Sequence, residues 1–224
     1  MKWIKIDDDS YGTILVSWCI SAVLIWLSAH FFSLWLSIPI SLILVTFMVF
    51  ITWFFRVPNR TAPDADNLRL VTSVADGKVV IVEKVFEKEY LQKECIQISV
   101  YMDFFDVHCN FWPIEGKVTY YKYHPGRYIL AFHPKSSELN EHSSSCLENQ
   151  YGQVFFKQIA GTFARRIVCY SEPGKMEYRG DQCGVIKFGS RIDIFLPLEA
   201  EIKVKVGDKV RAVESVLAIL PDLP

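Results

Sequence analysis

The chain has 224 residues, of which 51% are hydrophobic and 22% are charged, and this composition excludes an intrinsically disordered protein. Its 24 basic and 25 acidic residues nearly balance, which argues against a nucleic-acid-binding protein, because phosphate contacts need a surplus of Lys and Arg. The charges are unevenly distributed: none lies among the 46 residues Ser10–Phe55, and 44 lie among the 169 residues from Arg56 onward. We therefore expect a membrane anchor, residues 1–55, joined to a globular domain, residues 56–224.

The uncharged segment is too long for one membrane-spanning helix. At about 1.5 Å per residue, its 46 residues would extend about 69 Å as a helix, more than twice the roughly 30 Å hydrocarbon core. Two spans fit, Gly12–Ala29 and Leu34–Phe54, with a turn at His30–Ser33. Lysines precede the first span, arginines follow the second and the turn has no basic residue, so both termini are expected on the cytoplasmic side. A buried helical hairpin in a soluble protein is the alternative.

In the globular domain the dominant hydrophobic period is two, which predicts strands. Ile96, Ile98, Val100 and Met102 alternate with more polar residues, as in a half-buried strand. Similar short runs are Val79–Val85, Lys117–Tyr123, Tyr128–Phe132, Val154–Ile159, Arg166–Tyr170, Val185–Phe188 and Ile192–Leu196. The polar, Ser-rich segment Glu138–Asn149 is interpreted as a surface loop. These features predict a mainly β (α+β) fold, with a compact barrel- or sandwich-like catalytic domain after an N-terminal two-helix transmembrane hairpin.

The six cysteines are widely spaced and include no C-x-x-C pair. This spacing predicts neither a zinc site nor a disulfide framework, and it is typical of a reducing compartment. No metal site and no nucleotide-binding loop are expected, since the sequence contains no G-x-G-x-x-G, P-loop or H-E-x-x-H motif.

Three segments hold residues that could perform chemistry. Asp76 precedes a glycine at the start of a strand, His108 lies in an aromatic-rich stretch, and Ser190 follows Gly189 between two apolar runs. Taken singly, each has a structural explanation: a tight turn, a structural histidine, a two-residue hairpin. The chemical alternative is that the Ser190 hydroxyl attacks the Gly189 carbonyl, with an imidazole as base and a carboxylate behind it. Elimination from the resulting ester would give dehydroalanine and then a pyruvoyl group.

Six motifs, taken together and in order, resemble the short, membrane-anchored bacterial form of the phosphatidylserine decarboxylase family. They are Phe54-Phe55-Arg56-x-Pro58-x-Arg60, Ala75-Asp76-Gly77-Lys78-Val79, Phe105-Asp106-Val107-His108-x-Asn110, Tyr123-His124-Pro125-Gly126, Gln158-Ile159-Ala160-Gly161-x-x-Ala164-Arg165-Arg166-Ile167-Val168 and Ile186-Lys187-Phe188-Gly189-Ser190-Arg191-x-Asp193. The resemblance extends from Phe54 to Leu220, and a two-span anchor also fits the family.

The resemblance implies a proenzyme that cleaves itself between Gly189 and Ser190. The large chain, residues 1–189, would stay associated with the small chain, residues 190–224. Ser190 would become the N-terminal pyruvoyl group of the small chain, which is then the only cofactor. A homo-oligomer is left open, and no nucleic-acid partner is expected.

In the family, an Asp–His–Ser set performs the cleavage, and Asp76, His108 and Ser190 occupy the matching positions. Two positions depart from the family pattern. Phe111 stands where longer members have a second histidine and short members commonly have Arg, so His108 must serve both cleavage and decarboxylation unless another group assists. Val74 replaces a common Pro and should alter only the local turn.

The implied reaction converts phosphatidylserine to phosphatidylethanolamine through a Schiff base between the substrate amine and the pyruvoyl carbonyl, which acts as an electron sink. His108 is the candidate acid that reprotonates the carbon. The implied location is the bacterial cytoplasmic (inner) membrane, with the catalytic domain on the cytoplasmic side and phosphatidylserine drawn from the bilayer.

Two sets of side chains are hypothesised to meet the membrane surface. Aromatic residues would place the site at head-group depth, and arginines would contact lipid phosphates. The aromatic residues are Phe104, Phe105, Phe111 and Trp112, and the arginines are Arg56, Arg60, Arg165 and Arg166.

Two other classes of function remain open. A Ser-His-Asp lipid hydrolase would favour a G-x-S-x-G nucleophile elbow, which this sequence lacks. An uncleaved, non-catalytic β-barrel binding module is the other alternative, because Lys205–Glu214 resembles the turn-and-strand pattern of biotinyl and lipoyl carriers, although the modifiable lysine hairpin is missing.

Overall fold

The computed structural model describes residues 5–129, 136–161, 167–187 and 190–222. They form two compact units, Met1–Asn59 and Arg60–Pro224. The first unit contains two long helices, α1 (Tyr11–Phe31) and α2 (Leu34–Phe54). Its short segments are β1 (Lys5–Ile6), the 3-10 helix η1 (Asp8–Ser10) and β2 (Arg56–Val57), which pairs antiparallel with β1.

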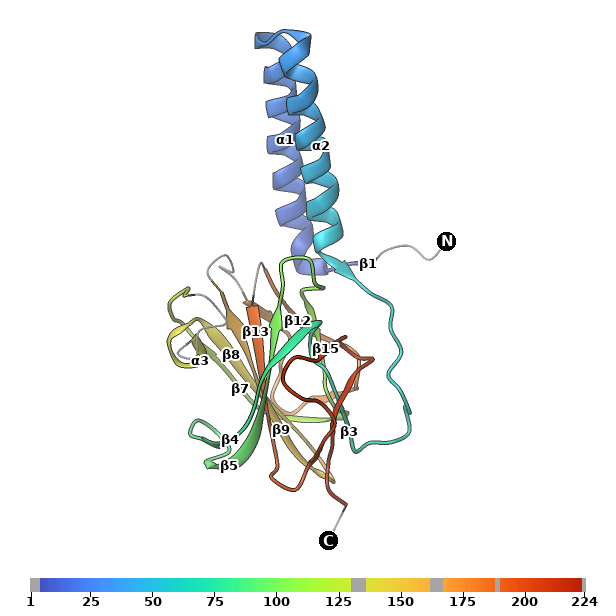
Figure 1. Ribbon diagram of the computed structural model, residues 1–224, viewed down its shortest axis with the longest axis vertical. Helices are drawn as coiled ribbons and strands as arrows, with labels where there is room; N and C mark the ends of the chain where they lie inside the picture. Colours follow the sequence, from blue (N-terminus) through green and yellow to red (C-terminus); the bar gives the residue numbers. More distant parts are fainter. Residues whose placement is uncertain (1–4, 130–135, 162–166, 188–189, 223–224) are drawn as a thin grey trace. The chain divides into compact units, whose positions relative to one another are not determined.

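Helices α1 and α2 lie side by side as an antiparallel hairpin (Figure 1). The Trp18 indole N–H donates to the Met48 carbonyl across the pair at 3.2 Å. Both helices are long and apolar enough to cross a membrane. Their large apolar side chains are exposed, up to 93% at Trp35, which favours spanning helices over the buried hairpin of a soluble protein. Helix α2 has the predicted bounds, and α1 is longer than predicted at both ends.

The second unit is built on an eight-stranded antiparallel sheet that curls into a half-barrel (Figure 1). Its strand order is β11-β7-β8-β9-β13-β5-β4-β15. The strands are β4 (Gly77–Glu87), β5 (Lys93–Met102), β7 (Gly116–His124), β8 (His142–Asn149), β9 (Gly152–Ala160), β11 (Met176–Glu177), β13 (Ser190–Leu196) and β15 (Lys209–Val210). The predicted mainly β fold is therefore confirmed.

Two three-stranded sheets and one short helix complete this unit. One sheet has the order β10-β12-β6 and the other β14-β16-β3. Their strands are β10 (Ile167–Cys169), β12 (Gln182–Ile186), β6 (Cys109–Phe111), β14 (Glu201–Ile202), β16 (Val216–Ile219) and β3 (Leu70–Thr72), and the helix is α3 (Ser136–Leu139).

Alternation along the strands gives the large sheet two different faces. The inner face carries the main core, where Ile98, Ile192 and Phe156 pack with Trp112 and other residues of the small sheets. The outer face carries a smaller apolar cluster of Cys95, Cys146, Phe155 and Phe195. Polar side chains such as Lys157 and Asp193 stand in the same alternation as this outer cluster.

The segment Glu138–Asn149 is not a surface loop, and that interpretation was wrong. It ends α3 and then forms β8, whose first six residues are buried. Its serines are satisfied inside the protein: Ser143 Oγ donates to Gln158 Oε1 at 2.7 Å, and Ser145 Oγ lies 2.6 Å from Ser171 Oγ. A serine-rich strand can therefore be buried because each hydroxyl finds a partner.

Two predicted strands and one possible hairpin also differ from the structure. Tyr128 and Ile129 are not in a strand, and 130–132 lie outside the described residues. Strand β10 is shorter than predicted, and Arg166 also lies outside them. A two-residue hairpin was considered for Gly189-Ser190. The strands on either side, β12 and β13, belong to different sheets and do not pair, and Gly189 lies outside the described residues.

Candidate active site

The segments that carry Asp76 and Ser190 meet at one end of the large sheet. Strand β13 begins at Ser190 opposite Met102, the last residue of β5. Strand β4 runs antiparallel to β5 on its other side, with Lys78 opposite Tyr101. Asp76, immediately before β4, is therefore at the same sheet end as Ser190.

Ser190 is fully buried on the inner face, between Met102 of β5 and Ala160 of β9. Its hydroxyl contacts the Met102 sulfur at 3.8 Å, and the Asn110 side-chain amide contacts the same sulfur at 3.8 Å. Sulfur is a weak acceptor, so the hydroxyl is held loosely. Gly189, the other half of the expected cleavage site, lies outside the described residues.

A buried amide network surrounds this serine. Gln158 Nε2 donates to Asn110 Oδ1 at 2.8 Å, and Gln158 Oε1 accepts from Ser143 Oγ at 2.7 Å. The network joins β6, β9 and β8, and it fixes the Asn110 amide next to Met102. Sequence reasoning did not assign these residues, although Asn110 and Gln158 both stand in the quoted motifs.

His108 is fully buried in the connection between β5 and β6. Its Nδ1 lies 2.9 Å from the Asp106 carbonyl oxygen, which can only accept, so Nδ1 carries the proton and a neutral ring has its lone pair on Nε2. The His108 carbonyl accepts from the Ile186 N–H at 3.1 Å. Because Ile186 is four residues before Ser190, this bond ties the histidine to the segment that leads to the serine.

Asp76 occupies a tight turn that only glycine can follow. Gly77 has φ of 151°, and a Cβ there would lie 2.2 Å from the Tyr101 carbonyl oxygen. The Asp76 carboxylate forms a two-point ion pair with the buried Arg60 guanidinium, and its Oδ1 also accepts from the Ala212 N–H at 2.8 Å. Asp76 is therefore held rigidly, by groups other than the histidine.

The three predicted residues come from connected segments but do not form a closed triad in this structure. The Phe111 N–H donates to the Val74 carbonyl at 3.0 Å, which joins the Asp76 turn to the strand after His108. Burial raises the pKa of Asp106, and the nearby Asp76 charge raises it further, so the Asp76 field reaches the loop next to His108. Asp76 is bonded to Arg60, and Ser190 contacts Met102, instead of His108.

Of the four aromatic residues that were expected to face the membrane, only two have exposed side chains. Phe104 and Phe105 are 40% and 66% exposed, whereas Phe111 and Trp112 are core residues at 3% and 1%. Strand β6 directs Phe111 inward, so this position supplies packing where an ionisable side chain was considered.

The arginine hypothesis needs correction at Arg60. Arg60 is buried against Asp76, which leaves it no exposed head group to meet a phosphate. The Arg56 guanidinium lies 3.5 Å from the Trp53 ring centre, a cation–π contact. Arg165 and Arg166 lie outside the described residues.

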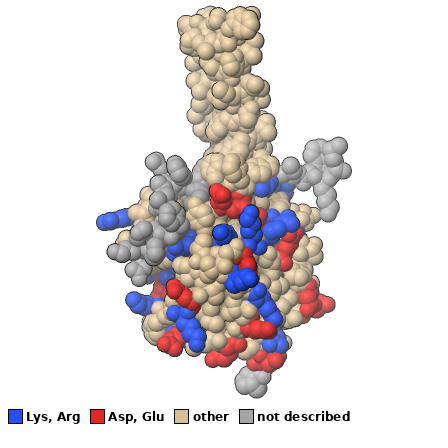
Figure 2. Space-filling view, in the orientation of Figure 1, with Lys and Arg blue, Asp and Glu red and all other residues tan. Residues whose placement is uncertain are grey.

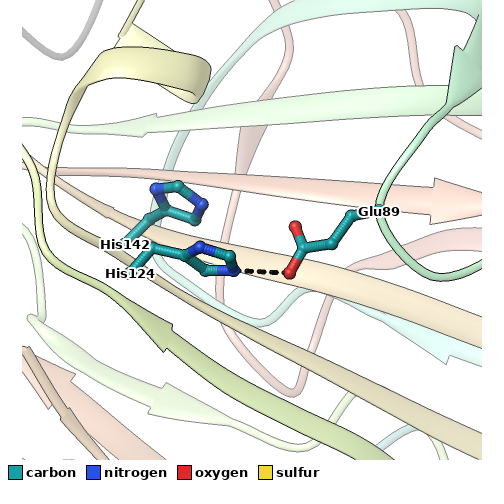
Figure 3. A group of neighbouring side chains, drawn as sticks. All are labelled: Glu89, His124 and His142. Carbon is teal, nitrogen blue, oxygen red and sulfur yellow. Dashed lines mark hydrogen bonds and ion pairs between the residues drawn. The ribbon is translucent and has the colours of Figure 1, made fainter.

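A second polar cluster lies on the outer face, and sequence reasoning missed it. Glu89, His124 and His142 offer one ligand atom each within 4.8 Å of one another (Figure 3). Of these, only His124 stood in a quoted motif. The cluster was invisible in the sequence because its members are separated by many residues and meet only through strand pairing.

Known proteins resemble most of this chain. A sequence model of the family described as phosphatidylserine decarboxylase matches residues 47–218. A protein of Amoebophilus asiaticus is 47% identical over 171 residues, which cover 76% of this chain and 75% of that protein. One from Porphyromonas gingivalis is 44% identical over 170 residues (75% and 77%), and one from Prosthecochloris aestuarii is 39% identical over 205 residues (90% and 93%). All three are named phosphatidylserine decarboxylase proenzyme, and the chain therefore belongs to the phosphatidylserine decarboxylase family.

Proposed function

We propose that this chain decarboxylates phosphatidylserine to phosphatidylethanolamine after cleaving its own backbone between Gly189 and Ser190 and converting Ser190 to a pyruvoyl group. The observation that carries the proposal is the position of Ser190. It is the first residue of β13, buried at the sheet end where the Asp76 turn and the His108 connection are also anchored.

The cleavage would use the chain's own groups. The Ser190 Oγ attacks the Gly189 carbonyl carbon and gives up its proton to His108 Nε2, the ring nitrogen that holds the lone pair. The peptide C–N bond breaks as the ester C–O bond forms, and the freed amine takes a proton. Elimination then releases residues 1–189 with a C-terminal carboxylate, and hydrolysis of the remaining dehydroalanine expels ammonia.

Asp76 is proposed to act through its charge. Its carboxylate is fixed by Arg60 and by the Ala212 N–H, and its field extends to the loop next to His108. A negative potential at this place would stabilise His108 after it has taken a proton. The positive charge of Arg60 partly offsets that potential.

The topology suits a chain that remains assembled after it is cut. Strand β13 of the proposed small chain lies between β5 and β9 of the large chain. Strands β15 and β16 of the small chain pair with β4 and β3 of the large chain. Strand β12, just before the cut, is paired on both sides with β10 and β6. Strands β12 and β13, on either side of the cut, would therefore keep their pairing partners after cleavage.

A pyruvoyl carbonyl at residue 190 would supply the electron sink for loss of CO₂. The site fits such a group, because conversion of Ser190 removes its amine nitrogen and its hydroxyl oxygen and adds one oxygen atom from water, which leaves a smaller group at this buried position. His108 would then move a proton from Nε2 to the carbon that has lost CO₂. Because the second histidine position is Phe111, packed in the core, the proposal gives both proton transfers to His108.

The membrane part of the proposal rests on α1 and α2. We propose that residues 1–55 anchor the protein in the bacterial inner membrane and that residues 56–224, the catalytic domain, face the cytoplasm. Helices α1 and α2 show no Lys, Arg, Asp or Glu on the visible face in Figure 2, whereas these residues are interspersed over the visible face of the second unit. A diacyl lipid scarcely leaves the bilayer, so an anchored enzyme meets its substrate where the substrate is.

The decisive test is the intact mass of purified, detergent-solubilised protein, together with hydroxylamine trapping and a decarboxylation assay in phosphatidylserine vesicles. We expect two chains, with the small one carrying a carbonyl in place of its amine. A single 25.8 kDa chain that still decarboxylates the lipid would overturn the proposed mechanism. Cleaved lipid esters with no trapped carbonyl would favour the hydrolase, and an intact inactive chain would favour the binding module.

A further inference from the structure

The cluster of Glu89, His124 and His142 lies on the outer face of the large sheet, away from the inner face that holds Ser190. His124 is the last residue of β7 and pairs in register with His142, the first residue of β8. Their rings stack with centres 4.3 Å apart and planes 14° apart. Glu89 follows β4 in the turn toward β5, and its carboxylate approaches the edges of both rings (Figure 3).

Two members of the cluster, His142 and Glu89, are oriented by neighbours outside it. His142 Nδ1 lies 2.7 Å from the Asn140 carbonyl oxygen, so this nitrogen donates and Nε2 keeps the lone pair. Glu89 Oε2 is held by Lys157 Nζ at 2.7 Å and by Ser144 Oγ at 3.0 Å. Such contacts from a carbonyl to a histidine and from donors to the distal carboxylate oxygen are the supports that metal ligands usually have.

The cluster is reachable from solvent. It lines a groove of about 680 Å³ whose walls include Glu83, Gln97 and Phe195. This volume leaves room for an ion and for water beside it. The Tyr120 hydroxyl and the Lys157 ammonium also approach the Glu89 carboxylate, so polar groups adjoin the cluster within a groove that has apolar walls as well.

We propose that Glu89, His124 and His142 bind a first-row transition dication of the Zn²⁺ type, through Glu89 Oε1 and the two Nε2 atoms, with water as the fourth ligand. Two imidazoles and one carboxylate suit this class, whereas Ca²⁺ and Mg²⁺ prefer sites made of oxygen atoms. The site is separate from the proposed cleavage machinery and needs no residue of it.

Binding requires a small rearrangement. A tetrahedral ion with bonds of about 2.0–2.1 Å holds its ligand atoms about 3.4 Å apart. Glu89 Oε1 and His124 Nε2 are now 2.6 Å apart and share a proton, which would pass to solvent as they separate. Glu89 stands in a turn and His124 at a strand end, so both can shift while the sheet pairing stays intact.

The competing explanation is a simple ion-pair network. In that case Glu89, His124 and Lys157 only fasten the β4–β5 turn to the sheet, and added metal has no specific effect. The two explanations differ in the stoichiometry and the spectrum of metal binding, both of which are independent of enzymatic activity.

The test is titration of the full-length, chelator-treated protein in detergent with Co²⁺, followed by absorption, and with Zn²⁺, followed by calorimetry. We expect one equivalent, with the intense visible bands of tetrahedral Co²⁺ and without the near-ultraviolet bands of thiolate ligation. His142→Ala and Glu89→Gln each remove a ligand, so each should weaken binding by at least the roughly 10–100-fold that is typical of losing only a supporting residue. Glu83→Gln, the same substitution at another carboxylate of the groove, is the matched control and should bind as wild type does.

Thermal unfolding provides a second readout. At the same concentration, Zn²⁺ should raise the unfolding midpoint of the wild type and of Glu83→Gln more than that of His142→Ala. His124→Asn is the reserve variant if either of the other two fails to fold. Absence of stoichiometric Co²⁺ bands in the wild type would overturn the proposal, as would thiolate bands or affinity retained within twofold in the folded variants.

Discussion

Successive residues of β13 lie on opposite faces of the large sheet, and their side chains are bonded very differently. On β13, Ser190 points into the apolar core, where a weak contact to Met102 holds its hydroxyl. The next residue, Arg191, lies on the outer face and is fully buried in an ion pair with Asp193, at 2.8 Å. On the inner face the Ser190 hydroxyl thus makes a weak contact with a sulfur atom, whereas on the outer face Arg191 and Asp193 form a close ion pair. Reactivity here is expected where the bonding is weakest.

Replacing the serine of the inner face should have the largest effect. Ser190→Ala removes the attacking hydroxyl, so we expect a single uncut chain and a decarboxylation rate lower by at least about 10³-fold. Denaturing electrophoresis and the vesicle assay measure both. Ser145→Ala, another buried serine of the sheet, is the matched control and should mature normally. Normal cleavage of Ser190→Ala would contradict the assignment.

The second largest effect is expected on the rate of self-cleavage, which should depend on His108 and not on His124 of the outer face. His108→Gln is expected to slow self-cleavage about 10²–10⁴-fold, because the proposed base is lost. His124→Asn, on the outer face, should leave the cleavage rate unchanged. The rate is followed from the uncut chain after synthesis in a cell-free system with detergent. Equal rates in both variants would remove His108 from the mechanism.

The ion pair behind the inner site should matter for stability. Arg60→Met leaves the Asp76 carboxylate buried without its partner, at an expected cost of about 3–5 kcal/mol in the free energy of unfolding. Lys203→Met breaks the pair with Glu201 on the surface and should cost less than about 1 kcal/mol. Urea unfolding in the Ser190→Ala background, which stays one chain, compares them. Similar losses would mean that the Arg60 pair is not effectively buried.

The smallest effect is expected from titration of the outer face. Burial alone would raise the pKa of Glu89. Its hydrogen bonds to Lys157 and His124, together with the positive charges of these two side chains, instead lower the pKa from 4.5 to about 2. Since the folded pKa is depressed, the stabilisation is complete above about pH 4.5 and is lost as the pH falls toward 2. The stability difference between metal-free wild type and Glu89→Gln should therefore shrink between these pH values. A difference independent of pH would refute this account.

Local pattern predicted much of the fold. The uncharged stretch located both helices, and strict alternation located β5 at Ile96–Met102. Strand β8 was missed because hydroxyl side chains carry no apolar period, although Ser143 and Ser145 are buried through partners on other segments.

The sequence identified individual residues of the candidate site but not the contacts between them. Asp76 was recognisable from the glycine that follows it. Its partner Arg60 stands in another quoted motif 16 residues away, and nothing local indicates that the two side chains pair. Phe111 illustrates the same limit, since an aromatic residue in a loop motif looks exposed until β6 pairs with β12. Distances between segments are set by strand register, and one sequence contains no direct record of register.

The connection from β12 to β13, which passes from one sheet to another, has a consequence for the lifetime of the enzyme. A prosthetic group made from residue 190 would be covalently part of a strand pinned on both flanks by its former other half. If that group were lost, for example by reduction with borohydride, it could not be replaced by a free cofactor molecule from solution. Each molecule would form its cofactor only once, when the chain matures, and lost activity could be restored only by synthesis of a new polypeptide.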